Sequence, residues 1–110
     1  MDRHAFPYDG PAELRQPVAH ALARVVDPEV ALNVVDIGLV YGVRIDASGA
    51  HVRLTMTSAA CPVADVIIDD VDSELARVLP AGMARDVELV WEPPWTPQMM
   101  SESARRFMDG

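Results

Sequence analysis

The sequence predicts an α+β domain, a small α/β sandwich in which helices pack on a three-stranded mixed sheet. Segments with strand-like alternation and segments with helical spacing follow one another in the order helix, strand, strand, helix, strand, helix. Half of the 110 residues are hydrophobic, which is typical of a globular protein. A chain of this length buries about 60–70% of its unfolded surface, enough for one core.

The N-terminal part of the chain predicts an arm followed by a helix. Residues 1–10 contain proline and glycine and show no period, so we expect a flexible arm, with a single domain over residues 11–110. Apolar residues recur at helical spacing through residues 12–26. Pro17 is tolerated in the first turn of a helix, so the helix is expected to begin near residue 15 and to end at Asp27-Pro28.

A hairpin and a long helix form the middle of the chain. Residues 39–46 and 50–56 each alternate apolar and polar side chains, and the turn between them predicts an antiparallel hairpin. Residues 30–36 are expected to connect the first helix to this hairpin. Residues 62–79 repeat apolar residues at helical spacing, with a proline at the first position.

The last third of the chain predicts one strand and one short helix. Residues 87–91 are expected to be the third strand, joined to the second by a right-handed crossover if the two run parallel. The proline-rich segment 92–97 excludes regular structure. Ser101 is placed to cap a helix over residues 101–108.

Composition excludes several classes of function. The 17 acidic residues outnumber 9 basic ones, and only Arg105 and Arg106 adjoin, so we expect no nucleic-acid partner. No apolar run reaches the roughly 18–20 residues that a membrane span needs, and the N-terminus lacks the apolar stretch of a signal peptide. A single cysteine excludes an intramolecular disulfide. We therefore expect a cytoplasmic protein that does not bind membranes.

Cys61 is the one thiol, and it lies where a strand gives way to a helix. The unpaired N–H groups and the positive end of a helix dipole favour a thiolate at such a corner. Asp65, in the first turn, opposes that effect, so the sequence leaves open whether Cys61 is more or less acidic than a free cysteine. Free cysteine is also among the most buried residue types, and Cys61 would then only fill the core.

Carboxylates and hydroxyls supply the other candidate site residues. Asp27 and Glu29 are solvated residues of a turn in the ordinary interpretation, and they serve a site only if folding brings them to the thiol. Thr57 and Ser58 precede Cys61, where their hydroxyls either cap the loop or line a small polar pocket.

Trp95 and the histidines are weaker candidates. Prolines bracket Trp95, which is typical of a structural tryptophan, although an exposed one would anchor a partner. The three histidines show no metal-ligand spacing. One cysteine and scattered histidines cannot build a zinc site or hold a whole iron–sulfur cluster.

Four short motifs follow one another along the chain: Asp27-Pro28-Glu29, DIGLVY at 36–41, TSAACP at 57–62 and WEPPW at 91–95. Their order and spacing resemble the MIP18 family, also called the DUF59 or PaaD-like domain, from about Leu14 to the C-terminus. The resemblance implies a fold like that of the C-terminal domain of NifU-type scaffolds and a role in maturing iron–sulfur proteins. By position it implies a site made of Asp27, Glu29, Thr57, Ser58 and Cys61.

The chain departs from parts of the family pattern. Many members carry two threonines before the cysteine, whereas Ser58 keeps only the hydroxyl. The zinc-ligand cysteines that the PaaD branch carries in a C-terminal extension are absent. The resemblance is therefore greater to the short, SufT-like branch.

The resemblance therefore implies an accessory factor for iron–sulfur cluster assembly or for maturation of iron–sulfur proteins, and we expect no enzyme with turnover. Cys61 would bind iron or a cluster only transiently, shared with a second protomer or a client because one thiolate is too few. The expected partners are the iron–sulfur assembly machinery, client apo-proteins and a second copy in a homodimer. The alternatives are an adaptor that binds clients through Trp95, an enzyme with a cysteine nucleophile, and an assembly component of a phenylacetyl-CoA-epoxidase-type (PaaD-like) oxygenase.

Overall fold

The computed structural model describes residues 6–28, 30–57 and 61–109, and every structural statement below concerns these residues. Its centre is a four-stranded sheet in the order β1-β4-β5-β6. β1 (Tyr8–Asp9) runs parallel to β4 (Val40–Asp46), β4 runs antiparallel to β5 (Gly49–Leu54), and β5 runs parallel to β6 (Arg85–Leu89). The α+β class, the mixed sheet and the predicted hairpin are confirmed.

The number of strands differs from the three that the sequence predicts. The additional strand, β1, comes from the segment predicted as an arm, where the Val43 N–H donates to the Pro7 carbonyl at 3.0 Å and Tyr8 lies opposite Val43. Two residues are too few to show an alternating pattern, so the sequence carries no signal for this strand. A separate two-stranded sheet of β2 (Val26–Asp27) and β3 (Leu32–Asn33) was also not predicted.

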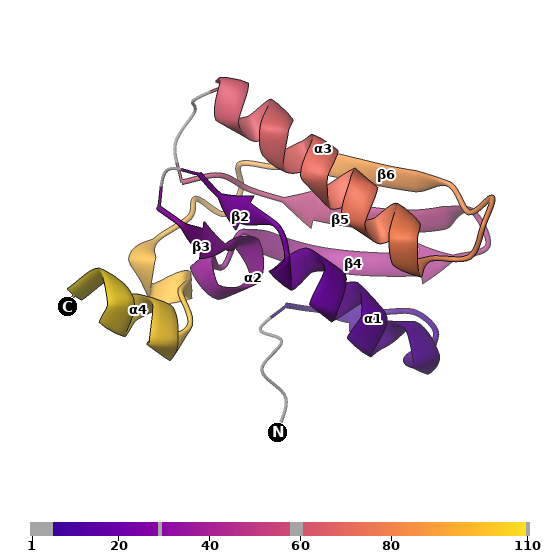
Figure 1. Cartoon of the computed structure of the whole chain (residues 1–110), viewed down its shortest axis with the longest axis horizontal. Coiled ribbons are helices and arrows are strands. Elements are labelled where there is room, and N and C mark those ends of the chain that lie inside the picture. Colours follow the sequence, from indigo (N-terminus) through magenta and orange to yellow (C-terminus); the bar gives the residue numbers. More distant parts are fainter. Residues whose placement is uncertain (1–5, 29, 58–60, 110) are drawn as a thin grey trace.

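Two helices cover one face of the four-stranded sheet (Figure 1). α1 spans Ala12–Ala23 and α3 spans Cys61–Val78, and the two contact each other. α1 begins earlier than predicted and contains Pro17. Proline has no N–H, so the carbonyl of the exposed residue Glu13 lacks its helical hydrogen bond. α1 also ends earlier, because the residues that follow it pair in the β2–β3 hairpin. α3 follows its predicted range closely.

The hydrophobic core fills the space between these helices and the sheet. α3 contributes buried residues at helical spacing and the strands contribute alternate residues, as expected when one face of a sheet is covered. The largest fully buried side chains are Leu22, Ile37, Leu39, Leu54, Ile67 and Leu75. On the other face Arg44 and Arg53 are exposed, so that face is open to solvent. Among the described residues, no helix combines the length and the apolar character needed to cross a lipid bilayer.

The Asp36-Ile37-Gly38-Leu39 motif forms the end of a short helix, α2 (Val34–Ile37). The Asn33 side chain caps α2: its Oδ1 accepts from the Asp36 N–H, and its Nδ2 donates to the Asp36 carboxylate, each at 2.9 Å. Gly38 ends the helix with a φ of 87°, in the left-handed region, and a Cβ at this position would overlap the Met99 carbonyl. The local structure therefore explains why the motif contains glycine.

The C-terminal segment is held against α2. The Trp95 Nε1–H donates to the Ile37 carbonyl at 2.9 Å, and the Ser101 N–H donates to the Asp36 carbonyl at 2.7 Å. Between these two anchors lies a 3-10 turn, η1 (Pro97–Met99).

The chain ends in the predicted last helix, α4 (Glu102–Asp109). The Ser101 hydroxyl accepts from the Ala104 N–H at 3.1 Å, so the predicted cap is confirmed.

Candidate functional site

Asp27 is a buried carboxylate. It lies on β2 with 1% of its surface exposed, and β2 contacts α3. The interpretation of Asp27 as a solvated residue of a turn is therefore wrong. Asp27 does not lie in a turn at the end of a helix but in β2, where it pairs with Leu32 of β3. Charged residues are almost never fully buried without a structural or functional reason, so Asp27 remains a candidate site residue.

A tight turn connects Asp27 to β3. The Ala31 N–H donates to the Asp27 carbonyl at 2.8 Å, and Ala31 has a φ of 61°. The left-handed region costs a residue with a Cβ roughly 1–2 kcal/mol, and such strain persists only where the surroundings fix the backbone. Val30, in the same turn, packs against the core. Glu29, the other predicted carboxylate, lies outside the described residues.

α3 begins at Cys61, as expected for a cysteine at a strand-to-helix corner. Figure 1 shows the β2–β3 hairpin on the side of the sheet that α3 covers, and β2 contacts α3. The structure thus brings the strand of Asp27 against the helix that Cys61 opens, although the two are far apart in the sequence. The Cys61 side chain lies outside the described part of the structure, so the exposure of its sulfur and its distance from Asp27 stay predictions.

Two threonines follow the end of β5. Thr57, a predicted site residue, is half-buried. The alternation of residues 50–56 predicts an exposed Thr55, but Thr55 is 1% exposed, and among the described residues its hydroxyl has no hydrogen-bond partner. The Thr55 N–H donates to the Leu39 carbonyl at 2.8 Å, next to the Val40–Leu54 pair, so the backbone still follows β4. The alternation of buried and exposed side chains nevertheless ends here, because Leu54, Thr55 and Met56 are all buried. Ser58 lies outside the described residues.

The described side chains do not form a metal site by themselves. No group of three His, Cys, Asp or Glu side chains in the described part of the chain is placed to hold a metal ion. Glu29 and the Cys61 side chain lie outside that part. An iron site at the start of α3 would therefore include side chains outside the described part of the chain or ligands from another protein.

Trp95 belongs to the fold. Its side chain packs against the core and bonds to α2, which confirms the structural interpretation. The exposed tryptophan of the WEPPW motif is Trp91, with 47% of its surface exposed. The alternative of an adaptor that uses Trp95 as its exposed anchor therefore loses its basis.

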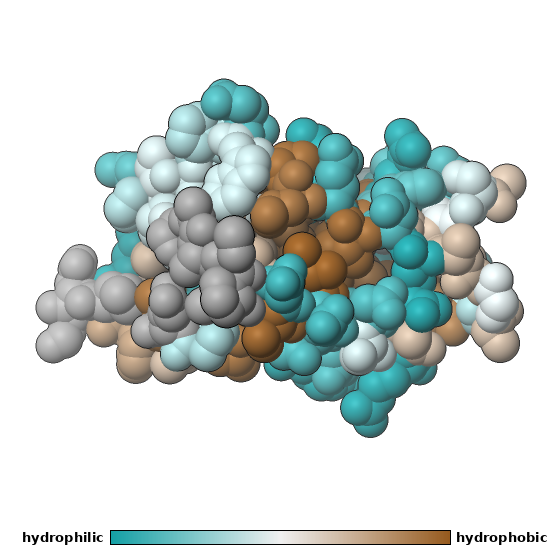
Figure 2. Space-filling view, turned by 90° about the horizontal axis from the view of Figure 1, so that it is seen from above, coloured by the Kyte–Doolittle hydropathy of each residue, from teal (hydrophilic) through white to brown (hydrophobic). Residues whose placement is uncertain are grey.

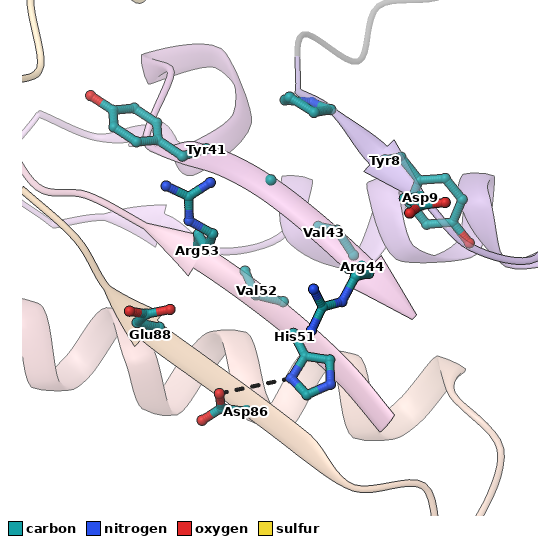
Figure 3. Close-up of a pocket in the computed structure, with 12 residues that line it drawn as sticks. Tyr8, Asp9, Tyr41, Val43, Arg44, His51, Val52, Arg53, Asp86 and Glu88 are labelled. Atoms are coloured by element: carbon teal, nitrogen blue, oxygen red, sulfur yellow. Dashed lines mark ion pairs between the residues drawn. The ribbon is translucent and has the colours of Figure 1, made fainter. Parts of the chain in front are cut away.

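A hollow of about 490 Å³ lies on the open face of the sheet, and none of the predicted site residues line it (Figure 3). The His51 ring lies between two carboxylates, with Nε2 at 3.6 Å from Asp46 Oδ1 and Nδ1 at 3.9 Å from Asp86 Oδ2. The alternation of the strands predicts a polar face here. Gly42 is one of the lining residues, and a Cβ added there would meet only the Pro7 carbonyl oxygen, at 4.0 Å.

The turn between β4 and β5 contains a carboxyl group, that of Asp46, whose pKa is lowered by hydrogen bonds. Asp46 Oδ1 accepts from the Ser48 hydroxyl at 2.6 Å and from the Ser48 N–H at 2.9 Å. These hydrogen bonds, with smaller contributions from Arg44 and His51, hold the pKa of the exposed Asp46 carboxyl below its ordinary value. Asp46 lies outside the predicted site.

Comparison with known proteins identifies the family of this chain. A family model described as "Iron-sulfur cluster assembly protein" matches residues 15–89. The chain is 43% identical over 93 residues to the Fe-S protein maturation auxiliary factor YitW of Bacillus subtilis, covering 84% of this chain and 90% of that protein. It is 44% identical over 82 residues to the Fe-S protein maturation auxiliary factor SufT of Staphylococcus aureus, covering 74% and 92%.

A solved structure agrees with this assignment. The crystal structure of a DUF59 domain from Bacillus anthracis superposes with a TM-score of 0.80 at 35% identity, covering 88% of this chain and 92% of that one. The chain therefore belongs to the iron–sulfur cluster assembly protein family, the DUF59 family that its four sequence motifs resemble.

Proposed function

We propose that this chain is an accessory factor in the maturation of iron–sulfur proteins and that Cys61 is its reactive group. Family membership supports the first part, because two relatives that match over nearly their whole length carry that description. The observation that carries the second part is the position of Cys61 at the start of α3, the helix against which the strand of buried Asp27 packs. The first turn of a helix favours the thiolate over the thiol.

In this proposal iron or a cluster is cargo that the Cys61 thiolate holds transiently. Thiolates are the usual ligands of iron–sulfur clusters, but a cluster takes four ligands, so the others come from a second protomer or from the client. Asp27 and Glu29 offer carboxylate oxygens, which hold iron weakly or accept protons. Thr57 and Ser58 hydrogen-bond the sulfur or order the loop before it.

The partners in this proposal are the cytoplasmic iron–sulfur assembly machinery, its client apo-proteins and a second copy of the chain. A homodimer has a chemical motive, because it supplies a second thiolate. Anaerobic reconstitution with iron and sulfide, followed by light scattering on a sizing column, tests this point. We expect the visible absorbance of the cluster to elute with the mass of a dimer. A strict monomer that retains a full cluster would refute the proposed homodimer.

Complementation tests the role of the thiol. A strain that lacks the gene receives the wild-type chain, Cys61→Ser, or the control Ser73→Ala, a change at an exposed position of the same helix. We expect the wild type and the control to restore the activity of several iron–sulfur enzymes, and Cys61→Ser to restore at most a tenth of it. Equal rescue by Cys61→Ser would remove the thiol from the mechanism. No rescue by any of the three would contradict the maturation role itself.

Asp27→Asn tests whether the buried carboxylate belongs to the same site. The change keeps the size of the side chain and removes its charge, so we expect reduced rescue with the protein still folded. Circular dichroism and the cellular level of the variant control for folding. Full rescue by Asp27→Asn would leave Asp27 a purely structural residue.

A further inference from the structure

β6 is an edge strand whose outer side is unpaired. It is last in the strand order, and Figure 1 shows no further strand beside it. The Ala84 carbonyl and the Val90 N–H both bond to residues of β5. Since even-numbered residues therefore face β5, the N–H and C=O groups of Arg85, Val87 and Leu89 face away from the sheet. No backbone hydrogen bond to these three N–H groups is found within the described ranges.

One side of this edge is apolar. Val87 and Leu89 pack toward the core but are only half-buried, as is Ile68 on α3. α3 contacts β6, and the Arg85 Nε–H donates to Asp72 of α3 at 2.9 Å. Figure 2, which looks down on α3 and β6, shows hydrophobic surface through the middle of this side. The helix thus leaves part of an apolar strip along the edge uncovered.

The other side of the edge is acidic. Asp86 and Glu88 alternate with the apolar residues, are exposed, and lie on the open face of the sheet (Figure 3). His51 is 3.9 Å from Asp86, and Arg53 is the register neighbour of Glu88. Within the described part of the chain, Glu88 forms no ion pair. A strand beside β6 would therefore meet two carboxylates on this side.

A second copy of the chain is a poor occupant of this edge. Antiparallel self-pairing centred on Val87 would set Asp86 of each copy opposite Glu88 of the other. Like charges directly opposite each other destabilise a strand pair. The formal net charge of -8 on each copy adds to the repulsion. A homodimer would therefore have to use another surface.

We propose that β6 accepts a fifth strand from a partner protein, an extended segment that alternates apolar and basic residues. Its backbone pairs with the outward groups of Val87 and Leu89, its apolar side chains cover the strip beside α3, and its basic side chains face Asp86 and Glu88. The partner segment is thus defined by its positive charge and by its alternation of apolar and basic residues. This inference does not involve Cys61, so it stands or falls separately from the proposed function.

Amide hydrogen exchange measured by NMR tests this inference. The probe is a synthetic octapeptide that alternates valine and lysine, with both ends blocked. In the free protein we expect the amides of Asp86 and Glu88, which face β5, to exchange slowly and those of Val87 and Leu89 to exchange quickly. Saturating peptide is expected to slow exchange at Val87 and Leu89 at least tenfold. A matched octapeptide of valine and glutamate is expected to leave both rates unchanged.

Val87→Pro removes an outward N–H that the sheet does not use, and proline is tolerated on edge strands for this reason. We expect thermal unfolding close to that of the wild type and at least tenfold weaker peptide binding. Glu88→Lys leaves every backbone N–H of β6 in place, so it tests the inference even if Val87→Pro fails to fold. It is expected to weaken binding of the lysine peptide at least tenfold and to allow binding of the glutamate peptide.

Four results would overturn the inference. The first is an absence of protection at millimolar lysine peptide. The second is equal binding of the two peptides. The third is binding of the lysine peptide to both variants as tightly as to the wild type. The fourth is protection of Val87 and Leu89 that grows with protein concentration in the absence of peptide, which would assign the edge to a second copy.

Discussion

Replacing Gly38 by alanine tests why the motif at the end of α2 needs glycine. Gly38 has a φ of 87°, and the left-handed region costs a residue with a Cβ roughly 1–2 kcal/mol. The added Cβ would also lie 2.8 Å from the carbonyl carbon and 2.9 Å from the Cβ of Met99. These distances are too short for non-bonded carbons, and the obstacle is mostly backbone. The variant can therefore fold only if η1 moves.

Gly82→Ala is the matched control. Its φ is 84°, and nothing lies within 4 Å of its added Cβ. Both variants therefore share the conformational cost, which the reduced freedom of the unfolded chain offsets by about 0.4–1 kcal/mol. Only Gly38→Ala adds the overlap, and forced overpacking costs about 1–3 kcal/mol more. We expect the free energy of unfolding to fall by about 1 kcal/mol in Gly82→Ala and by about 2–4 kcal/mol in Gly38→Ala.

Urea unfolding followed by circular dichroism gives both values, provided that the slope against urea concentration is unchanged. The Trp95 indole N–H, which bonds to the Ile37 carbonyl beside Gly38, reports the local effect. Its hydrogen exchange should accelerate in Gly38→Ala and not in Gly82→Ala. Equal losses of stability in the two variants, with the indole protected in both, would refute the reasoning.

Three other changes test separate features. Trp95→Phe leaves the buried Ile37 carbonyl without its donor and should lower the free energy of unfolding by about 1–3 kcal/mol in urea; an unchanged value would contradict this. Ala31→Gly relieves left-handed strain but loosens the unfolded chain, so urea unfolding should show a net gain of up to about 1 kcal/mol. Ser48→Ala should return the pKa of Asp46 toward its ordinary value in an NMR titration. Because the folded pKa of Asp46 is lowered, its contribution to stability is present above the unfolded pKa of about 3.9 and is lost as pH falls through the folded pKa. The stability difference between Ser48→Ala and the wild type should therefore be smaller at pH 2 than at pH 7.

The elements that the sequence predicts closely are long and buried on one face. The β4–β5 hairpin and α3 repeat their apolar residues often enough to define a period. The end of the first helix shows where helical spacing fails as a predictor. Val25 fits the helical period and is buried, but it lies beyond the end of α1. Its carbonyl accepts a hydrogen bond from the Val34 N–H at 2.9 Å instead of a bond within α1. β1, β2, β3 and α2 each have two to four residues, too few to define a period. β1 also depends on pairing with the distant strand β4, and α2 on hydrogen bonds from the C-terminal segment.

The residues of the candidate site also differ in how well the local sequence predicts their positions. The position of Cys61 between a strand and a helix follows from local pattern, since the alternation before it and the helical spacing after it are both clear. The burial of Asp27 does not follow from local pattern, because it depends on β2 pairing with β3 and contacting α3. Thr55 departs from the alternation of residues 50–56 because its burial depends on what covers the end of the strand and not on the local sequence.

The crossover from β5 through α3 to β6 relates the two proposed surfaces. β5 and β6 run parallel, with Leu54 opposite Leu89, so both strands finish at the same end of the sheet. The chain leaves β5 at that end and soon begins α3 at Cys61. A partner strand added along β6 would therefore extend toward the end of the sheet from which the segment carrying the thiol departs. If both proposals hold and the partner is a client, binding of its strand along β6 would bring that client to the same end of the sheet from which the chain leaves toward Cys61.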